Sequence, residues 1–88
     1  MTKIEELRKQ IDEIDTEMIE LFQKRMETVE QIAECKKVIN MNTDDPNREK
    51  RIIESHLPDV KEKWKHYYEC FQKELFRLSK EYQDELRK

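Results

Sequence analysis

The sequence predicts an all-α protein with three helices, and three observations lead to this prediction. The chain has 88 residues with no glycine and only two prolines, and 44% of its residues are charged. Good helix formers such as Glu, Lys, Gln and Leu are abundant. The apolar residues recur in steps of three or four, which is typical of packed amphipathic helices and not of a disordered charged chain. A chain of this length is expected to form a single domain, residues 1–88.

The first predicted helix is the longest and spans residues 3–40. Thr2 and Glu5 form a capping-box pattern at its start. At 1.5 Å per residue this helix measures roughly 55 Å, whereas a compact chain of this size has a radius of gyration of about 12 Å. Because such a rod does not fit inside one globule, we expect an intertwined homodimer that shares the long first helix. Its apolar stripe consists of Ile4, Leu7, Ile11, Ile14, Met18, Leu21, Val29, Ile32 and Ile39.

Two further helices are predicted after a polar connector at residues 40–44. Asp45 as N-cap and Pro46 at the first helical position predict a second helix over residues 46–56, which Pro58 ends. Pro58 is then expected to open the third helix, residues 59–87, for the same reason as Pro46. The apolar face of this third helix is expected to form core or dimer contacts. It consists of Val60, Trp64, Tyr67, Phe71, Leu75, Leu78, Tyr82 and Leu86, widened by Phe76.

Composition and charge exclude several functions. The net charge is −3 with acids and bases interspersed, which disfavours a nucleic-acid partner. The chain has no apolar run of about 18 residues and no signal-peptide pattern, so we expect a cytoplasmic protein without a membrane partner. Cys35, Cys70, His56 and His66 lack metal-ligand spacing, so two free thiols and no metal site are expected.

Arg25 and Lys36 interrupt the apolar stripe of the first helix. They lie 11 residues apart, about three turns, and therefore share a face roughly 16 Å apart along the axis. Charges on a buried face are usually paired or bound to a ligand. On spacing alone, the favoured interpretation is a pair of cations that extend to solvent from the helix edge or that pair with glutamates. The other interpretation is an anion pocket.

Other polar residues outside the apolar pattern are candidates for the same site. Arg8 lies 17 residues before Arg25, about 25 Å away and on a different face. It could therefore reach only the partner's pocket in an antiparallel dimer, or it is an ordinary exposed arginine. Arg48 in the first turn of the second helix is unfavourable to the helix dipole, which hints at another reason for its presence. Ser79 and Gln83 are four residues apart beside the apolar face, a spacing also common at any amphipathic edge.

These residues, taken in order, resemble the all-helical (AroQ-type) chorismate mutases over nearly the whole chain. The resemblance rests on Leu7-Arg8-x-x-Ile11-Asp12-x-Ile14-Asp15, on Arg25 and Lys36, on Asp45-Pro46-x-Arg48-Glu49, and on Leu78-Ser79-x-x-x-Gln83. It implies three helices per chain in an intertwined dimer. It also implies the rearrangement of chorismate to prephenate, an intramolecular pericyclic step that needs no cofactor, nucleophile or proton transfer. Such a step needs a folded dianionic substrate and stabilisation of charge on the breaking ether oxygen.

The resemblance also implies a role for each catalytic residue. Arg25 and the partner's Arg8 would clamp the substrate carboxylates, for which a guanidinium fork is suited. Lys36 and Gln83 would donate hydrogen bonds to the ether oxygen, and Lys36 would also touch a carboxylate.

Four more residues would bind substrate by the same resemblance. Glu49 would accept a hydrogen bond from the ring hydroxyl, with Asp45 nearby, and Arg48 and Ser79 would complete the anionic end. The connector at residues 40–44 departs from the family pattern, because it lacks the Pro-plus-apolar pair often found there. Asp44 also adds a negative charge close to the expected anion pocket.

Two other functions are compatible with the pattern. One is an isochorismate pyruvate-lyase of the same fold, which would release pyruvate. The other is a non-catalytic helical dimerisation or regulatory module. In such a module, replacing Arg25 and Lys36 by Met would leave function intact and raise stability by relieving buried charge.

Overall fold

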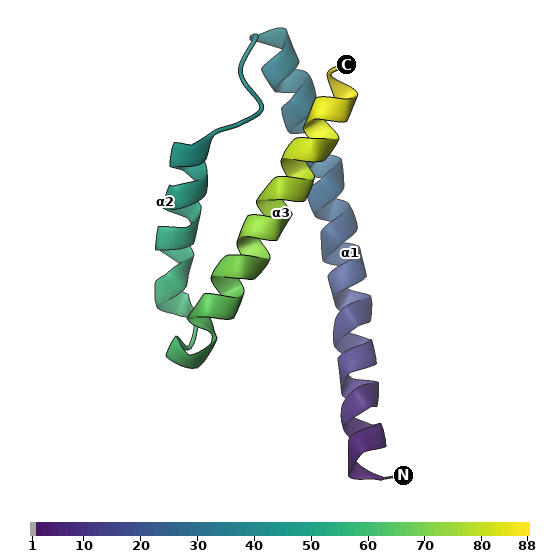
Figure 1. Ribbon diagram of the computed structural model, residues 1–88. Helices are drawn as coiled ribbons and strands as arrows, with labels where there is room; N and C mark the ends of the chain where they lie inside the picture. The colour runs from purple at the N-terminus through teal and green to yellow at the C-terminus, as the bar shows by residue number, and fades with distance from the viewer. Residues whose placement is uncertain (1) are drawn as a thin grey trace.

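The computed structural model describes residues 2–88 and consists of three α-helices (Figure 1). Helix α1 spans Lys3–Val38, α2 spans Pro46–His56 and α3 spans Lys65–Leu86. Two short 3₁₀ turns, Leu57–Asp59 and Glu62–Trp64, join α2 to α3. Residues 2–88 contain no strand, so the predicted all-α class is confirmed. Within the same residues, no helix is long and apolar enough to cross a membrane.

Both ends of α1 are set by local sequence. At the start, the Thr2 hydroxyl accepts a hydrogen bond from the Glu5 amide at 3.2 Å, and the Glu5 carboxylate accepts one from the Thr2 amide at 3.4 Å. The predicted capping box is therefore confirmed. At the end, Asn40 adopts φ 54°, a left-handed conformation that asparagine tolerates better than most residues. The Met41 amide then donates to the Lys36 carbonyl at 2.8 Å, which closes the helix as a Schellman motif two residues before the predicted end.

Helix α2 has the boundaries that the sequence predicts, residues 46–56. Asp45 is its N-cap, and the Asp45 carboxylate accepts a hydrogen bond from the Arg48 amide at 3.1 Å. Pro46 occupies the first turn, where its missing N–H leaves no bond unmade.

The predicted start of the third helix at residue 59 is wrong, because α3 begins at Lys65. Pro58 and Asp59 lie in a 3₁₀ turn instead, and Val60 after them is extended, with φ −99° and ψ 135°. Lys61 is also extended, at ψ 138°. Pro58 therefore closes α2 with a short turn, and the extended residues after it redirect the chain before α3 can start.

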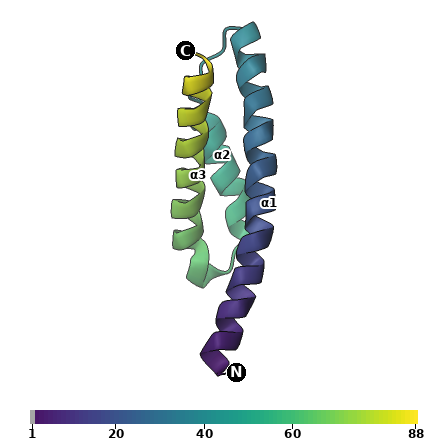
Figure 2. The same ribbon diagram turned by 90° about the vertical axis from the view of Figure 1, so that its right-hand side faces the viewer.

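Packing within the chain involves the C-terminal part of α1, α2 and α3, which lie side by side in Figures 1 and 2. The buried apolar side chains are Val29 and Ala33 of α1, Ile53 of α2 and Phe76 of α3. This is a small core for 88 residues.

The buried face of α3 differs from the predicted apolar face. Its buried residues are Gln72, Phe76, Ser79 and Gln83. At about 100° per residue, this face lies roughly a quarter turn from the predicted apolar one. Three polar residues therefore face inward on α3 beside Phe76, and the predicted apolar face lies at its flank, where Tyr67 and Phe71 are 70% and 49% exposed.

The N-terminal part of α1 also lacks a covering element. It extends past both other helices in the two views (Figures 1 and 2). Leu7 and Ile11 there are 42% and 55% exposed, and of the predicted stripe only Val29 is buried. The molecule measures 55 × 26 × 15 Å with a radius of gyration of 16.5 Å, well above the roughly 12 Å of a compact chain. Trp64 and Tyr67, predicted as core or dimer contacts, are 50% and 70% exposed and are not core residues of the single chain.

Candidate active site

A cavity of about 330 Å³ lies among α1, the connector, α2 and α3, and brings most of the predicted site residues together. Seven of the eight line it, and they come from three helices and one helix cap: Arg25, Lys36, Asp45, Arg48, Glu49, Ser79 and Gln83. The rest of the lining is Val29, Ile32, Met41, Thr43, Ile52, Phe76 and Lys80. The cavity thus combines charged and amide groups with an apolar floor.

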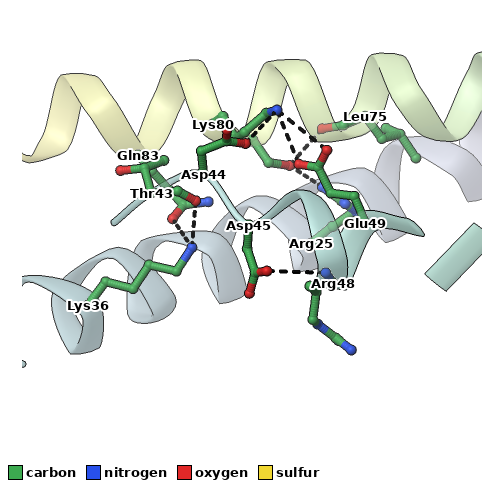
Figure 3. A network of polar contacts seen from close by, with 11 residues as sticks. Arg25, Lys36, Thr43, Asp44, Asp45, Arg48, Glu49, Leu75, Lys80 and Gln83 are labelled. Atoms are coloured by element: carbon green, nitrogen blue, oxygen red, sulfur yellow. Dashed lines mark hydrogen bonds and ion pairs between the residues drawn. The ribbon is translucent and has the colours of Figure 1, made fainter. Parts of the chain in front are cut away.

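Arg25 enters the cavity from α1 and is oriented by α3. Its Nη1 donates to the Ser79 hydroxyl, which in turn donates to the Leu75 carbonyl at 2.8 Å (Figure 3). Arg25 is half-buried, and desolvation lowers the pKa of its guanidinium from the usual value. Arginine nevertheless stays charged at neutral pH. Only one of the five N–H groups of the guanidinium donates to Ser79, so the others remain free to donate to a ligand.

Lys36 is held by two oxygens at the other end of the cavity. Its Nζ donates to the Thr43 carbonyl at 2.9 Å and to Gln83 Oε1 at 3.1 Å (Figure 3). An ammonium has three N–H donors, so one remains for a ligand. Gln83 is only 5% exposed, and since its carbonyl end faces Lys36, its NH₂ group is left to donate elsewhere.

Asp45, Arg48 and Glu49 reach the cavity from the start of α2. One oxygen of the Asp45 carboxylate is engaged by the Arg48 amide as the helix cap, which ties Asp45 to the local fold. The Arg48 side chain is exposed at the cavity edge. Glu49 forms an ion pair with Lys80, at 3.1 Å between Oε2 and Nζ.

The cavity has an excess of positive charge that the protein leaves uncompensated. Four cations and two carboxylates line it. Among residues 2–88, no salt bridge joins Arg25, Lys36 or Arg48 to a carboxylate, whereas Lys80 pairs with both Asp44 and Glu49. Cations that are partly withdrawn from water and lack a counter-ion favour the binding of an anion.

Arg8 is the predicted site residue that the cavity does not contain. It is exposed on the N-terminal part of α1 and lies outside the lining. This agrees with the expectation that Arg8 cannot reach the pocket of its own chain.

Sequence reasoning missed Lys80 and Thr43. Lys80 lies four residues after Phe76 and three before Gln83, and this spacing could have indicated that it shares their face. Thr43 contributes its backbone carbonyl to Lys36, and no side-chain pattern could have indicated that.

The lining also limits the chemistry. It contains no His or Cys that could pair with a hydroxyl as a nucleophile and base. Residues 2–88 contain no cluster of three His, Cys, Asp or Glu side chains arranged for a metal, and Cys35 and Cys70 are exposed free thiols. Oriented donors around an apolar floor suit the binding and electrostatic stabilisation of an anion that also carries apolar surface.

Fold and cavity together define a small all-helical protein whose long first helix carries unpaired cations into a pocket. The chain belongs to the chorismate mutase type II family, whose model matches residues 7–84. It is 38% identical over 52 residues to a chorismate mutase of Methanocaldococcus jannaschii, covering 59% of this chain and 52% of that protein.

A second relative is a bifunctional chorismate mutase/prephenate dehydratase of Aquifex aeolicus. It is 39% identical over 57 residues, covering 65% of this chain and 16% of that protein. The chain thus spans only about half, or less, of the length of these curated relatives. No solved structure gives a significant match.

Proposed function

We propose that this chain is a chorismate mutase that converts chorismate to prephenate by a pericyclic rearrangement, without a cofactor. The observation that carries the proposal is the convergence of unpaired Arg25 and Lys36 with Gln83 on one cavity with an apolar floor. The same residues stand at the spacing of the family to which the chain belongs. Since this reaction belongs to phenylalanine and tyrosine biosynthesis, we propose a cytoplasmic location.

In this proposal, the protein accelerates the reaction by conformer selection and electrostatic stabilisation. Arg25, oriented by Ser79, binds a substrate carboxylate and holds the dianion in its folded conformer. The remaining N–H of Lys36 and the NH₂ of Gln83 donate to the ether oxygen as negative charge develops on it. Lys36 also contacts a carboxylate.

The start of α2 supplies the rest of the site. Glu49 accepts a hydrogen bond from the ring hydroxyl, with Asp45 beside it, and Arg48 contributes positive charge at the anionic end. The single domain that we propose for residues 1–88 supplies the cavity from all three helices, with lining residues between Arg25 and Gln83.

We further propose that the active form is an intertwined homodimer in which the partner's Arg8 completes each site. The N-terminal part of α1 is uncovered and apolar, with Ile4 54% and Ile14 50% exposed. An apolar groove of about 650 Å³ lies beside Arg25, lined by Met18, Phe22 and Phe71 among others. A second α1 crossing in an antiparallel sense would cover the groove and carry Arg8 to the cavity.

The decisive experiment is an assay of purified protein with chorismate. Depletion of chorismate with formation of prephenate, in the presence of a chelator, is the expected result. Release of pyruvate from isochorismate would instead favour the lyase of the same fold. No turnover of either compound at micromolar protein would favour a binding or dimerisation module and would contradict the proposal.

Shared sites have their own test by complementation between two inactive variants. Arg8→Ala and Arg25→Ala should each abolish turnover. After subunit exchange, a heterodimer has one site with both arginines. Random exchange makes half of the dimers heterodimers, so the equimolar mixture should regain about one quarter of the parent activity. No recovery, with exchange verified by native mass spectrometry, would argue against shared sites.

A further inference from the structure

Lys80 differs from the other cations of the cavity because its charge is fully engaged. Its Nζ lies 3.1 Å from Asp44 Oδ1 and 3.1 Å from Glu49 Oε2, and 3.5 Å from Glu49 Oε1 (Figure 3). The hydrogen bonds to Asp44 and Glu49 raise the pKa of the Lys80 ammonium, so it remains charged at neutral pH. An ammonium whose donors point at two carboxylates is poorly placed to bind a ligand anion.

Three separate segments meet at this ammonium. Asp44 belongs to the connector, Glu49 to the first turn of α2, and Lys80 to the C-terminal half of α3. The Lys80 side chain is only 32% exposed and Glu49 25%, so this pair interacts more strongly than a fully exposed one, whereas Asp44 is 62% exposed. Lys80 also offsets the negative charge of Asp44 beside an anion-binding cavity.

The Asp44 contact has a consequence for Lys36. Thr43, the residue before Asp44, accepts the hydrogen bond from Lys36 Nζ through its backbone carbonyl. Fixing Asp44 on α3 therefore also fixes the carbonyl that orients Lys36. The Thr43 hydroxyl accepts a hydrogen bond from Nη1 of Arg87, the C-cap of α3, at 2.9 Å, so α3 and its C-cap hold the connector at two points.

We propose that Lys80 is a positioning residue for the reaction: it aims the Glu49 carboxylate into the cavity and fastens the connector to α3 through Asp44. This role rests on the proposed function, because Glu49 is the acceptor there for the ring hydroxyl. Lys80 acts through Glu49 and Thr43 and need not contact the substrate.

The test compares steady-state kinetics of the full chain and its variants with chorismate. Lys80→Met should lower kcat/KM about tenfold or more, since it releases Glu49 and leaves two carboxylates beside an anion site. Lys80→Arg, which can pair with both carboxylates, should stay within about threefold of the parent. Lys73→Met is the matched control, because Lys73 lies on the same helix, outside the cavity lining, and its ion pair among residues 2–88 is with Glu69 of the preceding turn. It should leave kcat/KM unchanged.

A double-mutant cycle separates positioning from a simple field effect on a dianion. In a Glu49→Gln background, Lys80→Met should lower kcat/KM by clearly less than in the parent, because the carboxylate it aims is gone. The same loss in both backgrounds would overturn the positioning of Glu49 by Lys80, because the contact with Asp44 does not depend on the Glu49 carboxylate. Thermal melts establish that each variant is folded, and Lys80→Gln replaces Lys80→Met if the latter is not.

The outcomes also separate this role from the proposed function. Full activity of folded Lys80→Met, or no rescue by Lys80→Arg, would overturn the positioning role and leave the chorismate mutase activity standing. Absence of turnover by the parent protein would overturn the proposed function, and with it the role of Lys80.

Discussion

At the residue scale, the cations of the cavity differ in the acceptors to which their N–H groups already donate. Lys36 uses two oxygens of the protein and keeps one N–H, while Lys80 is paired with two carboxylates. A charge that is partly buried without a counter-ion destabilises the fold, unless a bound ligand supplies the opposite charge. The arrangement at Lys36 is therefore the form expected of a residue retained for binding and catalysis.

Lys36→Met should separate catalysis from stability. We expect kcat to fall by about 10²- to 10³-fold, because one donor to the developing charge is removed. The melting temperature should stay the same or rise, since an uncompensated cation is replaced by an apolar side chain of similar length. The control is Lys37→Met, which changes an exposed lysine one residue away. Retained activity in Lys36→Met would remove Lys36 from the mechanism.

Spacing along the first helix singled out Arg25 and Lys36, and the family resemblance was needed to predict the other five residues that line the cavity. Arg25 and Lys36 could be found because an interrupted apolar stripe on a regular helix fixes which side chains share a face. The role of Thr43 could not be predicted, because it depends on the path of an irregular connector. That these residues bind chorismate stays a prediction until turnover is measured.

At the element scale, helix starts were more predictable than the link between α2 and α3. Thr2 and Asp45 are local caps whose hydrogen bonds need no tertiary context. Pro58 is ambiguous in a sequence, since proline both ends one helix and starts another. The backbone at Val60 is extended, so the chain is not helical directly after Pro58. This conformation could be seen only in the structure.

The end of α1 depends on the left-handed conformation of Asn40, at φ 54°. Asn40→Ala should lower the free energy of unfolding by about 1 kcal/mol, because a Cβ without a compensating polar group disfavours this conformation. Asn40→Gly should be neutral or stabilising, since glycine is the preferred residue at this position. Urea unfolding of the two variants checks the prediction. Equal stability of Ala and Gly variants would show that the conformation carries no penalty.

A hydrogen bond between α1 and α3 makes the free energy of unfolding depend on pH in the alkaline range. The Tyr82 hydroxyl on α3 donates to Glu30 Oε1 on α1 at 2.5 Å, and this bond raises the pKa of Tyr82. Because the pKa of Tyr82 is raised in the folded state, its hydrogen bond contributes fully to the free energy of unfolding below the unfolded-state pKa of about 10. This contribution is lost as the pH rises through the folded-state pKa.

The parent should therefore be more stable than Tyr82→Phe at neutral pH. The difference should begin to fall above about pH 10 and disappear above the raised folded-state pKa of Tyr82. Denaturant unfolding between neutral and alkaline pH measures it. Tyr67→Phe, at a tyrosine that is 70% exposed, is the control and should show no such trend. A stability difference between parent and Tyr82→Phe that persists at high pH would contradict the assignment.

At the scale of the whole molecule, the single chain has two uncovered apolar surfaces. One is the N-terminal part of α1, and the other is the flank of α3 that includes Tyr67 and Phe71, 70% and 49% exposed. The sequence identifies both apolar faces through their helical periodicity. Periodicity does not say which chain covers such a face, so burial within one chain could not be inferred from it. Exposed apolar side chains that follow one another along a helix face are typical of an interface between subunits.

Ile11→Glu tests whether this surface joins two copies of the chain. Ile11 lies in the middle of the uncovered stripe and is 55% exposed, so a carboxylate there is tolerated in a monomer and buried in a dimer. We expect native mass spectrometry to report a dimer for the parent and a monomer for the variant. Activity should fall with the dimer by at least about tenfold, because the partner's Arg8 no longer reaches the cavity.

Lys9→Glu is the matched control, because residue 9 lies on the opposite side of α1 from the stripe at about 100° per residue. It introduces the same side chain two positions away and should leave both the dimer and the activity in place. A monomeric parent with full turnover would mean that one chain suffices. A dimeric, active Ile11→Glu would mean that the chains meet through another surface, such as the flank of α3, and that Arg8 has no part in the site.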